Sequence, residues 1–137
     1  MDPNYSVAYA MLGQAYASNG LYREALPDLD KYLALSRGGA ASLALLGYAH
    51  ARLGERNEAL RMLEELAAVS KRSYVPAFSF ALVHAGLEDK DQAFTWLEKA
   101  CEERFNRLAY VKVEALWDPL RSDPRFAELL RRVGIPL

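Results

Sequence analysis

The stretch LGYAHARLGERNEAL, residues 46–60, decides the fold, because the chain carries nearly the same pattern 34 residues earlier. There, residues 12–26 read LGQAYASNGLYREAL. Both stretches open on Leu-Gly, hold a second glycine at the same distance and close on Glu-Ala-Leu. A fixed period of this length indicates a repeated supersecondary unit.

The period runs through most of the chain. Three blocks, 6–39, 40–73 and 74–107, align without insertion or deletion and leave the tail 108–137. Agreement at five slots is more than chance provides, so we expect three copies of one structural unit. The five slots hold Leu12, Leu46 and Phe80; Gly13, Gly47 and Ala81; Tyr16, His50 and His84; Ala25, Ala59 and Ala93; and Leu29, Leu63 and Leu97.

Each block is predicted to form two amphipathic helices joined by a turn. Apolar residues recur at helical spacing on either side of Asn19-Gly20 in the first block and of Gly54 in the second. Glycine takes the left-handed conformation after a helix end most easily, so Gly20 and Gly54 mark the ends of the first helices. The small residues in the slots of Gly13 and Ala25 allow the two helices to cross closely.

This pattern resembles the tetratricopeptide repeat, a 34-residue unit that favours Leu-Gly, Tyr, Gly, Ala and Pro in a fixed order. The resemblance covers about residues 3–107, with LGQAY and NGLYREAL in the first block and LGYAH and LGERNEAL in the second. It implies an all-α, right-handed superhelix of three helix-turn-helix repeats. Residues 1–137 would form a single domain, with a C-terminal capping segment at 108–137.

Two positions depart from the ideal pattern, and a third extends it toward the N-terminus. In the third block Glu88 replaces the turn glycine and Gly86 precedes it, so we expect the first helix of that block to end early. Pro27 falls inside a second helix, where it removes a backbone hydrogen bond at a cost of about 3 kcal/mol and predicts a kink. Pro3 stands where the family's proline closes a preceding repeat, which suggests that the chain is a fragment or begins on a repeat boundary.

Composition argues against several classes of function. The 137 residues carry a net charge of −1 and are 52% apolar, which favours a globular domain and gives no electrostatic reason to bind nucleic acid or a membrane surface. The N-terminus lacks the features of a secretory signal, and no apolar run reaches the roughly 20 residues of a membrane helix. The compartment stays open: the cytoplasm is favoured, and the periplasm fits a membrane-anchored protein.

No catalytic, metal or cofactor site is predicted. His50 and His84 share one slot between the two helices of a repeat, where we expect a half-buried packing residue rather than a metal or acid-base pair. The one cysteine, Cys101, falls in the slot of Leu33 and Ala67 and is expected to act as a small buried apolar residue. Since no phosphate loop or nucleophile motif occurs, we expect a protein that is not an enzyme and uses no cofactor.

By the resemblance, the first helices of the repeats line a concave face that binds peptides or helices. The implied groove residues are mostly apolar, and the Lys, Asn and Arg side chains of the family's carboxylate clamp are absent from them. We predict that Tyr48 and Phe78 anchor a protein or peptide partner; the alternative is that part of this apolar stripe is ordinary core, covered by neighbouring repeats or by the next subunit. The predicted groove residues are Val7, Ala10, Met11, Gln14, Leu45, Tyr48, Arg52, Phe78, Ser79 and Leu82.

The tail is predicted to cap the stack. Asp123 can cap a helix that begins at Pro124, and Gly134 with Pro136 can end it. A repeat stack exposes the apolar face of its last helix, and an amphipathic helix can cover that face. The predicted cap residues are Asp123, Pro124, Phe126, Leu129, Leu130 and Val133, with Arg125, Glu128, Arg131 and Arg132 facing water.

The C-terminal part has a second resemblance. DKDQAFTWLEKACEER and LRSDPRFAELLRRVGIP are similar to the C-terminal ends of bacterial multidomain signalling proteins, in which tetratricopeptide repeats follow a winged-helix, Ser/Thr kinase or adenylate cyclase domain. This implies a regulatory scaffold that binds a protein or peptide in its groove. The alternative is a self-association module that forms a homodimer or positions an upstream output domain.

Overall fold

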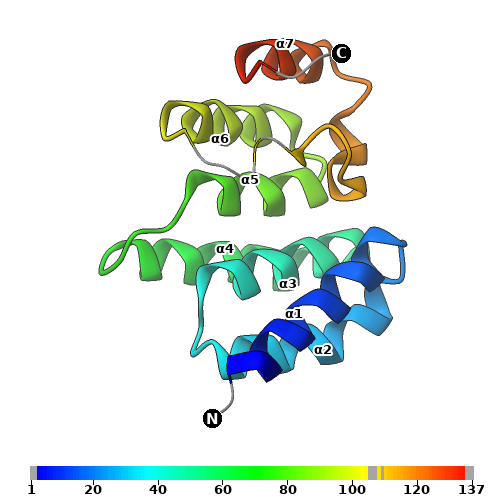
Figure 1. The fold of residues 1–137 in the computed structure, drawn as a ribbon, viewed down its shortest axis with the longest axis vertical. Coiled ribbons are helices and arrows are strands. Elements are labelled where there is room, and N and C mark those ends of the chain that lie inside the picture. The colour runs from blue at the N-terminus through cyan, green and yellow to red at the C-terminus, as the bar shows by residue number, and fades with distance from the viewer. Residues whose placement is uncertain (1–2, 105–107, 109, 135–137) are drawn as a thin grey trace.

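The computed structural model describes residues 3–104, 108 and 110–134, and within them all regular structure is helical. Three helix pairs follow one another along the chain, and a short 3₁₀ helix and a last α-helix come after them (Figure 1). The bounds are α1 Pro3–Ser18, α2 Tyr22–Leu35, α3 Ala40–Arg52, α4 Arg56–Ser70, α5 Ala77–Gly86, α6 Lys90–Glu102, η2 Ala115–Leu120 and α7 Pro124–Arg132.

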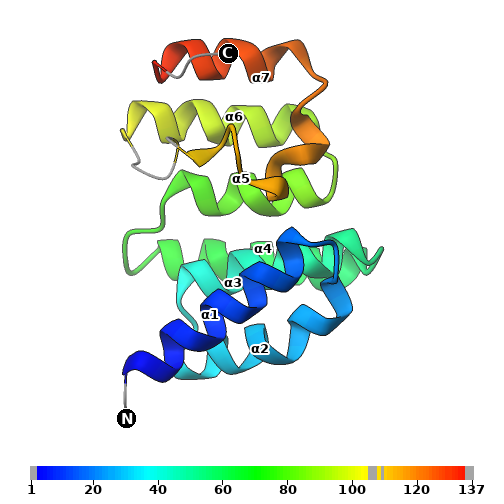
Figure 2. The same ribbon diagram turned by 45° about the vertical axis from the view of Figure 1, so that its right-hand side comes forward.

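The helix pairs stack along the long axis of the molecule, from α1 and α2 at one end to α7 at the other (Figures 1 and 2). Each helix packs on its pair partner, and consecutive pairs meet through α2 with α3 and through α3 with α5. Small residues lie at the crossings as expected, and Ala25, Ala59 and Ala93 are fully buried. A Cβ on Gly47 would lie 2.8 Å from Val83 Cγ2, so this glycine allows α3 and α5 to approach closely.

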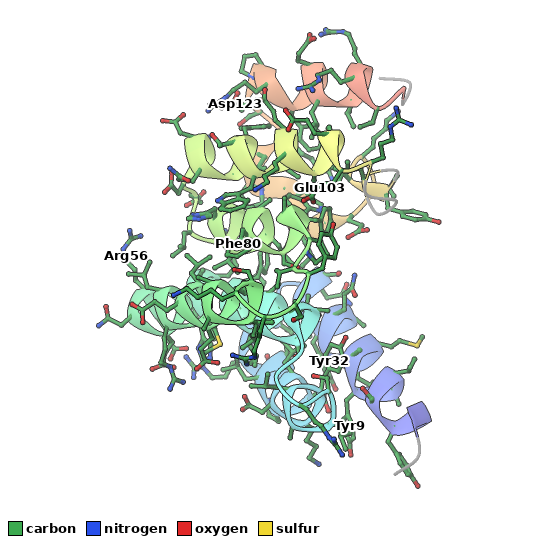
Figure 3. All side chains as sticks on the ribbon, turned by 90° about the vertical axis from the view of Figure 1, so that its left-hand side faces the viewer. Tyr9, Tyr32, Arg56, Phe80, Glu103 and Asp123 are labelled. Carbon is green, nitrogen blue, oxygen red and sulfur yellow. The ribbon has the colours of Figure 1, made fainter. Side chains whose placement is uncertain are left out.

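Contacts between the helices of the third repeat continue the core. Phe80 of α5, labelled in Figure 3, stacks on Trp96 of α6 with ring centroids 4.3 Å apart. Glu103, which follows α6, accepts the Ala77 backbone N–H at 3.0 Å. This bond satisfies one of the unpaired N–H groups at the start of α5.

The first helix of every repeat ends in the same hydrogen-bonded turn. In the second repeat the Glu55 N–H donates to the His50 carbonyl at 2.9 Å, around Gly54 with a φ of +78°. The third repeat forms the same turn around Glu88, whose φ is +58°. These are Schellman turns, which place a left-handed residue directly after the helix end.

The expectation that α5 ends early is wrong. α5 ends at Gly86, in the same slot as the last residues of α1 and α3, because Glu88 takes the left-handed conformation in place of glycine. The helix is short at its start instead. Proline disfavours helical backbone in the residue before it, so Val75 stays outside the helix. Pro76 is the N-cap of α5, and Ala77 is its first residue.

Two other prolines also have defined positions. Pro3 is the first residue of α1 rather than the end of a preceding helix, since a residue without an N–H donor is tolerated in a first turn. Pro27 lies inside α2, which runs from Tyr22 to Leu35 as one helix. The kink at Pro27 stays a prediction.

The tail ends in the predicted helix. Hydrogen bonds from the Arg125 side chain and backbone N–H lower the pKa of Asp123 to about 2, and the backbone bond measures 2.9 Å. Pro124 begins α7, and Gly134 follows it with a φ of +77°; Pro136 lies outside the described residues. Phe126, Leu129 and Leu130 are buried and Val133 is half-buried, whereas Arg125, Glu128, Arg131 and Arg132 are exposed.

Between α6 and α7 the chain passes over the repeat stack in a segment that we call the strap, residues 110–120. Its helix η2 packs on α5 and α1. The Arg121 guanidinium holds the strap, since it donates to the main-chain carbonyls of Lys112 and Glu114 and to the Asp118 carboxylate. The strap buries Val111, Leu116, Trp117 and Leu120.

Candidate functional site

An apolar cleft of about 390 Å³, which we call the groove, opens on the face formed by the first helices of the repeats. Among the described residues that line it, Glu114 is the one charged side chain. The lining residues are Ala10 and Gln14 of α1, Tyr32 of α2, Ala40, Ala41, Ala44 and Leu45 of α3, Pro76, Phe78, Ser79 and Leu82 at and within α5, and Glu114 and Leu116 of the strap.

Helical spacing brings these side chains to one face. Ala41 and Ala44 lie three residues apart on α3, and Phe78 and Leu82 lie four apart on α5, so each pair points the same way. The two alanines are too small to fill the space between helices, whereas Leu116 closes the groove from the strap. The groove therefore depends on small residues in α3 and on the position of the strap.

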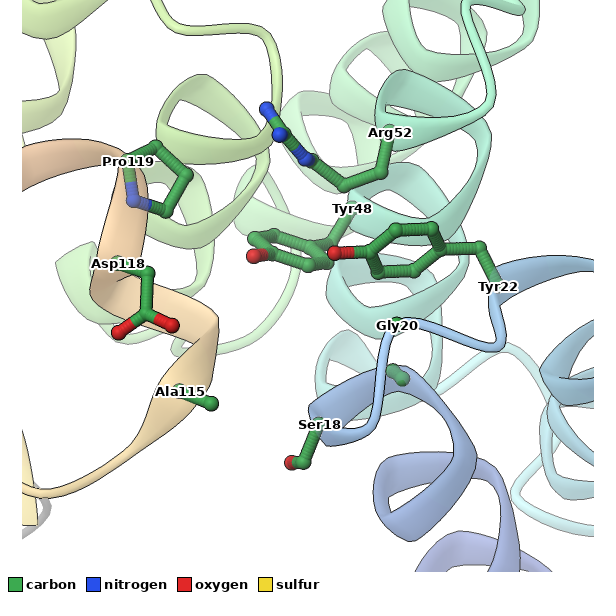
Figure 4. A pocket seen from close by; sticks show the side chains of 9 residues that line it. Ser18, Gly20, Tyr22, Tyr48, Arg52, Ala115, Asp118 and Pro119 are labelled. Carbon is green, nitrogen blue, oxygen red and sulfur yellow. The ribbon is translucent and has the colours of Figure 1, made fainter.

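The strap also borders a second, more polar pocket of about 370 Å³ (Figure 4). Tyr22, Tyr48, Arg52 and Asp118 line it. The charge of Arg52 already has partners, because its guanidinium donates to a main-chain carbonyl of α5 at 3.3 Å and lies 3.8 Å from the Glu88 carboxylate.

The structure brings together part of the predicted groove. Arg52 and Tyr48 line the polar pocket instead. Val7 and Met11 line neither cavity and are 56% and 68% exposed. The predicted residues that do line the groove are Ala10, Gln14, Leu45, Phe78, Ser79 and Leu82.

The hypothesis that Tyr48 and Phe78 anchor a partner does not fit their burial. Tyr48 is 1% exposed, since it packs on Gly86 and on the Tyr22 ring at a centroid distance of 6.1 Å. Burial, together with Tyr22, raises the pKa of Tyr48. Phe78 is 7% exposed and meets the Trp117 ring edge to face at 5.0 Å. Both rings are core residues in this structure, and Phe78 offers a partner only the atoms that face the groove, as the similarly buried Leu45 and Leu82 do.

Sequence reasoning missed the contribution of the strap. Glu114 and Leu116 lie in the tail, where the 34-residue period is lost, so no slot predicted their place beside α3 and α5. Tyr32 lies on a second helix, and the resemblance assigned the groove to first helices only. The adjacent apolar residues Leu116 and Trp117 indicate that this part of the tail is buried, but the sequence does not indicate which helices they pack against.

The histidines and the cysteine are half-buried. His50 Nδ1 lies 2.9 Å from Glu55 Oε1, and this hydrogen bond lowers the pKa of Glu55. Burial lowers the pKa of His84 and raises the pKa of the Cys101 thiol, which disfavours a reactive thiolate. Within the part of the chain that the structure describes, no group of three or more His, Cys, Asp or Glu side chains is placed to hold a metal ion.

Stacked helix pairs that share one apolar groove define a helical-repeat protein, a class in which an extended face serves as the binding surface. Comparison with protein families agrees: one tetratricopeptide repeat model matches residues 6–38 and another matches residues 40–77, together more than half of the chain. The chain belongs to the tetratricopeptide repeat family. No curated protein and no solved structure matches it significantly.

Tetratricopeptide repeats are in general non-enzymatic scaffolds that mediate protein–protein interactions and bind protein or peptide partners. None of the helices in the described ranges is long and apolar enough to cross a membrane.

Proposed function

We propose that the groove is the surface on which this protein binds a protein or peptide partner. The observation that carries the proposal is an apolar cleft on the face to which the first helices of all three repeats contribute. Removal of apolar surface from water drives most association, and a cleft surrounds a bound side chain on several sides.

The groove suits a short segment with a few apolar side chains. Its volume of about 390 Å³ lies in the range of pockets that hold small ligands or side chains, so a partner inserts residues rather than a whole domain. Leu45, Leu82 and Leu116 line the groove and are 7%, 5% and 2% exposed, so a bound segment contacts only those of their atoms that face the groove. Gln14 and Ser79 carry the polar groups that can bind the backbone of such a segment.

A groove-filling substitution tests the proposal. Ala41 lines the groove and is exposed, so Ala41→Trp fills it from the edge without entering the core. Ala67 is an exposed alanine on α4 that does not line the groove, and Ala67→Trp is the matched control. Peptides selected from a random library on the immobilised wild-type chain should bind A41W about tenfold more weakly, a loss of about 1.4 kcal/mol, and A67W unchanged. Equal binding to all three chains would contradict the proposal.

We further propose that the chain is a regulatory module of a larger bacterial signalling protein. The support is the similarity of residues 89–104 and 120–136 to the C-terminal ends of such proteins. The test is the reading frame upstream of Met1, where a winged-helix, kinase or cyclase domain is expected. A frame that encodes none of these domains would count against the proposal.

Self-association is the second candidate function. The observation that favours it is the set of exposed apolar side chains on α1, among them Tyr5, Met11 and Leu12 at 61%, 68% and 49% exposure.

A further inference from the structure

The groove and the polar pocket are consecutive sections of one surface, which we call the channel. On α1, Ala10 and Gln14 line the groove, and Ala17 and Ser18 line the polar pocket. Ala17 and Ser18 follow Gln14 by three and four residues, so they lie on the same side of the helix one turn further along. The side of α1 that begins in the groove therefore continues into the polar pocket.

α3 shows the same succession. Ala41 and Leu45 line the groove, and Tyr48 and Arg52 line the polar pocket. These four positions are separated by four, three and four residues, which places them along one side of the helix. Two neighbouring helices thus carry the channel from its apolar section, the groove, to its polar section.

The strap lies between the two sections. Its helix η2 packs on α5 and on α1, the first helices of the third and first repeats, so it crosses the channel. Leu116 lines the groove, whereas Ala115, Asp118 and Pro119 line the polar pocket. Figure 4 shows these three residues across the pocket from Tyr48. The strap therefore divides the channel, and Leu116 is the side chain of η2 that borders the groove.

We propose that Leu116 determines which apolar side chain of a partner the groove accepts. This inference rests on the proposed function of the groove as the binding surface. Leu116 forms the wall of the groove on the strap side, and a partner's apolar side chain, which we call the anchor, stops against it. Only 2% of Leu116 is exposed, so it acts through the space that it occupies. A smaller residue at this position admits a larger anchor, and a larger residue admits a smaller one.

The strap is held by residues other than Leu116. Arg121 donates to two main-chain carbonyls of the strap, and Trp117 and Leu120 are fully buried. These contacts support the strap on the C-terminal side of Leu116 when its side chain is shortened. Since a packed interior relaxes only partly around a deleted side chain, most of the space of the lost atoms is added to the groove.

Binding of a peptide series tests the proposal. The series starts from a peptide selected on the wild-type chain, and its anchor is the apolar residue whose change to alanine weakens binding most. Versions with valine or phenylalanine as the anchor are titrated against each chain by fluorescence anisotropy. Leu116→Ala should raise the ratio of phenylalanine to valine affinity about tenfold, and Leu116→Phe should lower it by a similar factor, because single methylene groups in an apolar pocket change affinity by about tenfold or more.

Two control variants separate selection of the anchor from stability. Leu120 is also a buried leucine of the strap but lines neither cavity, so Leu120→Ala should lower stability and leave the affinity ratio unchanged. Leu116→Met keeps the volume of the side chain and should keep the wild-type ratio. Circular dichroism at the temperature of the titration shows that each variant is folded. Leu116→Ala and Leu116→Phe stress the fold in opposite ways, one by a cavity and one by overpacking, so either variant alone decides the outcome.

The same titrations distinguish this proposal from the proposed function. The selected peptide should bind A41W about tenfold more weakly than wild type, a loss of about 1.4 kcal/mol. Equal binding to A41W and wild type would overturn both proposals. Weaker binding to A41W, together with one affinity ratio in wild type, L116A and L116F, would leave the groove as the binding surface and overturn the role of Leu116. A shift in L120A as large as that in L116A would overturn it as well.

Discussion

Glu88 takes the left-handed backbone conformation at the turn between α5 and α6, where the first two repeats have glycine. Its φ of +58° costs a residue with a Cβ roughly 1–2 kcal/mol relative to glycine. The turn forms nevertheless, because the Glu88 and Asp89 N–H groups bond to the last carbonyls of α5 at 3.0 Å each. Hydrogen bonds at the helix end therefore outweigh the local preference for glycine at this position.

Glu88→Gly should raise the free energy of unfolding by about 1 kcal/mol, because glycine takes the left-handed conformation without a Cβ clash. Glu88→Ala is the control: it keeps a Cβ and removes only the exposed pair with Arg52, so little change is expected. Gly54→Ala should lower the free energy of unfolding by a similar amount, about 1 kcal/mol. The added Cβ has no atom within 4 Å, so the cost comes from the φ of +78° alone. Urea unfolding measures all three, and an E88G chain no more stable than E88A would contradict this explanation.

At the scale of elements, the strap depends on contacts between parts of the tail itself. Arg121 binds the carbonyls of Lys112 and Glu114, and its guanidinium lies 5.3 Å from the centroid of the Phe126 ring on α7. One side chain thus contacts both the strap and α7. The strap in turn places Trp117 against Phe78 and closes the groove with Leu116.

Arg121→Ala should loosen the strap and lower the free energy of unfolding by about 1–3 kcal/mol, because two partly buried carbonyls lose a charged donor. Trp117 is fully buried, so its fluorescence should shift to longer wavelength in a Trp96→Phe background. Arg121→Lys should give an intermediate shift, since a single ammonium cannot replace a planar guanidinium at several acceptors. An unchanged emission spectrum in R121A would argue against Arg121 as the residue that holds the strap.

The helices could be predicted from the sequence, and the strap could not. The 34-residue repeat predicts the positions of α1 to α6, and the N-cap residue Asp123 followed by Pro124 predicts the start of α7. The strap has no repeat counterpart, and its path is set by bonds from Arg121 to main-chain carbonyls, which are not encoded in side-chain type. The sequence left the burial of Tyr48 open for a related reason, since Tyr22 and Gly86 cover it from two other helices.

For the whole molecule, α7 and the end of the strap are expected to keep the apolar surface of the helix stack away from water. Deletion of residues 117–137 exposes the faces that Trp117, Leu120 and α7 cover, so we expect aggregation or loss of the cooperative melt. Arg131→Gln is the control, because it removes only an exposed ion pair with Glu128 and should melt as wild type. Calorimetry and light scattering report both effects, and an unchanged melting curve after the deletion would disprove the capping role.

Binding by this protein is proposed to take place in the groove. The most direct measurement is a methyl NMR titration of the isotope-labelled chain with a peptide selected on the wild-type protein. The groove proposal predicts that the largest shifts fall on Leu45, Leu82 and Leu116, with Leu12 on the outer face of α1 and Leu60 on α4 unchanged. Shifts centred on Leu12 or Leu60, with the three groove leucines unaffected, would contradict it.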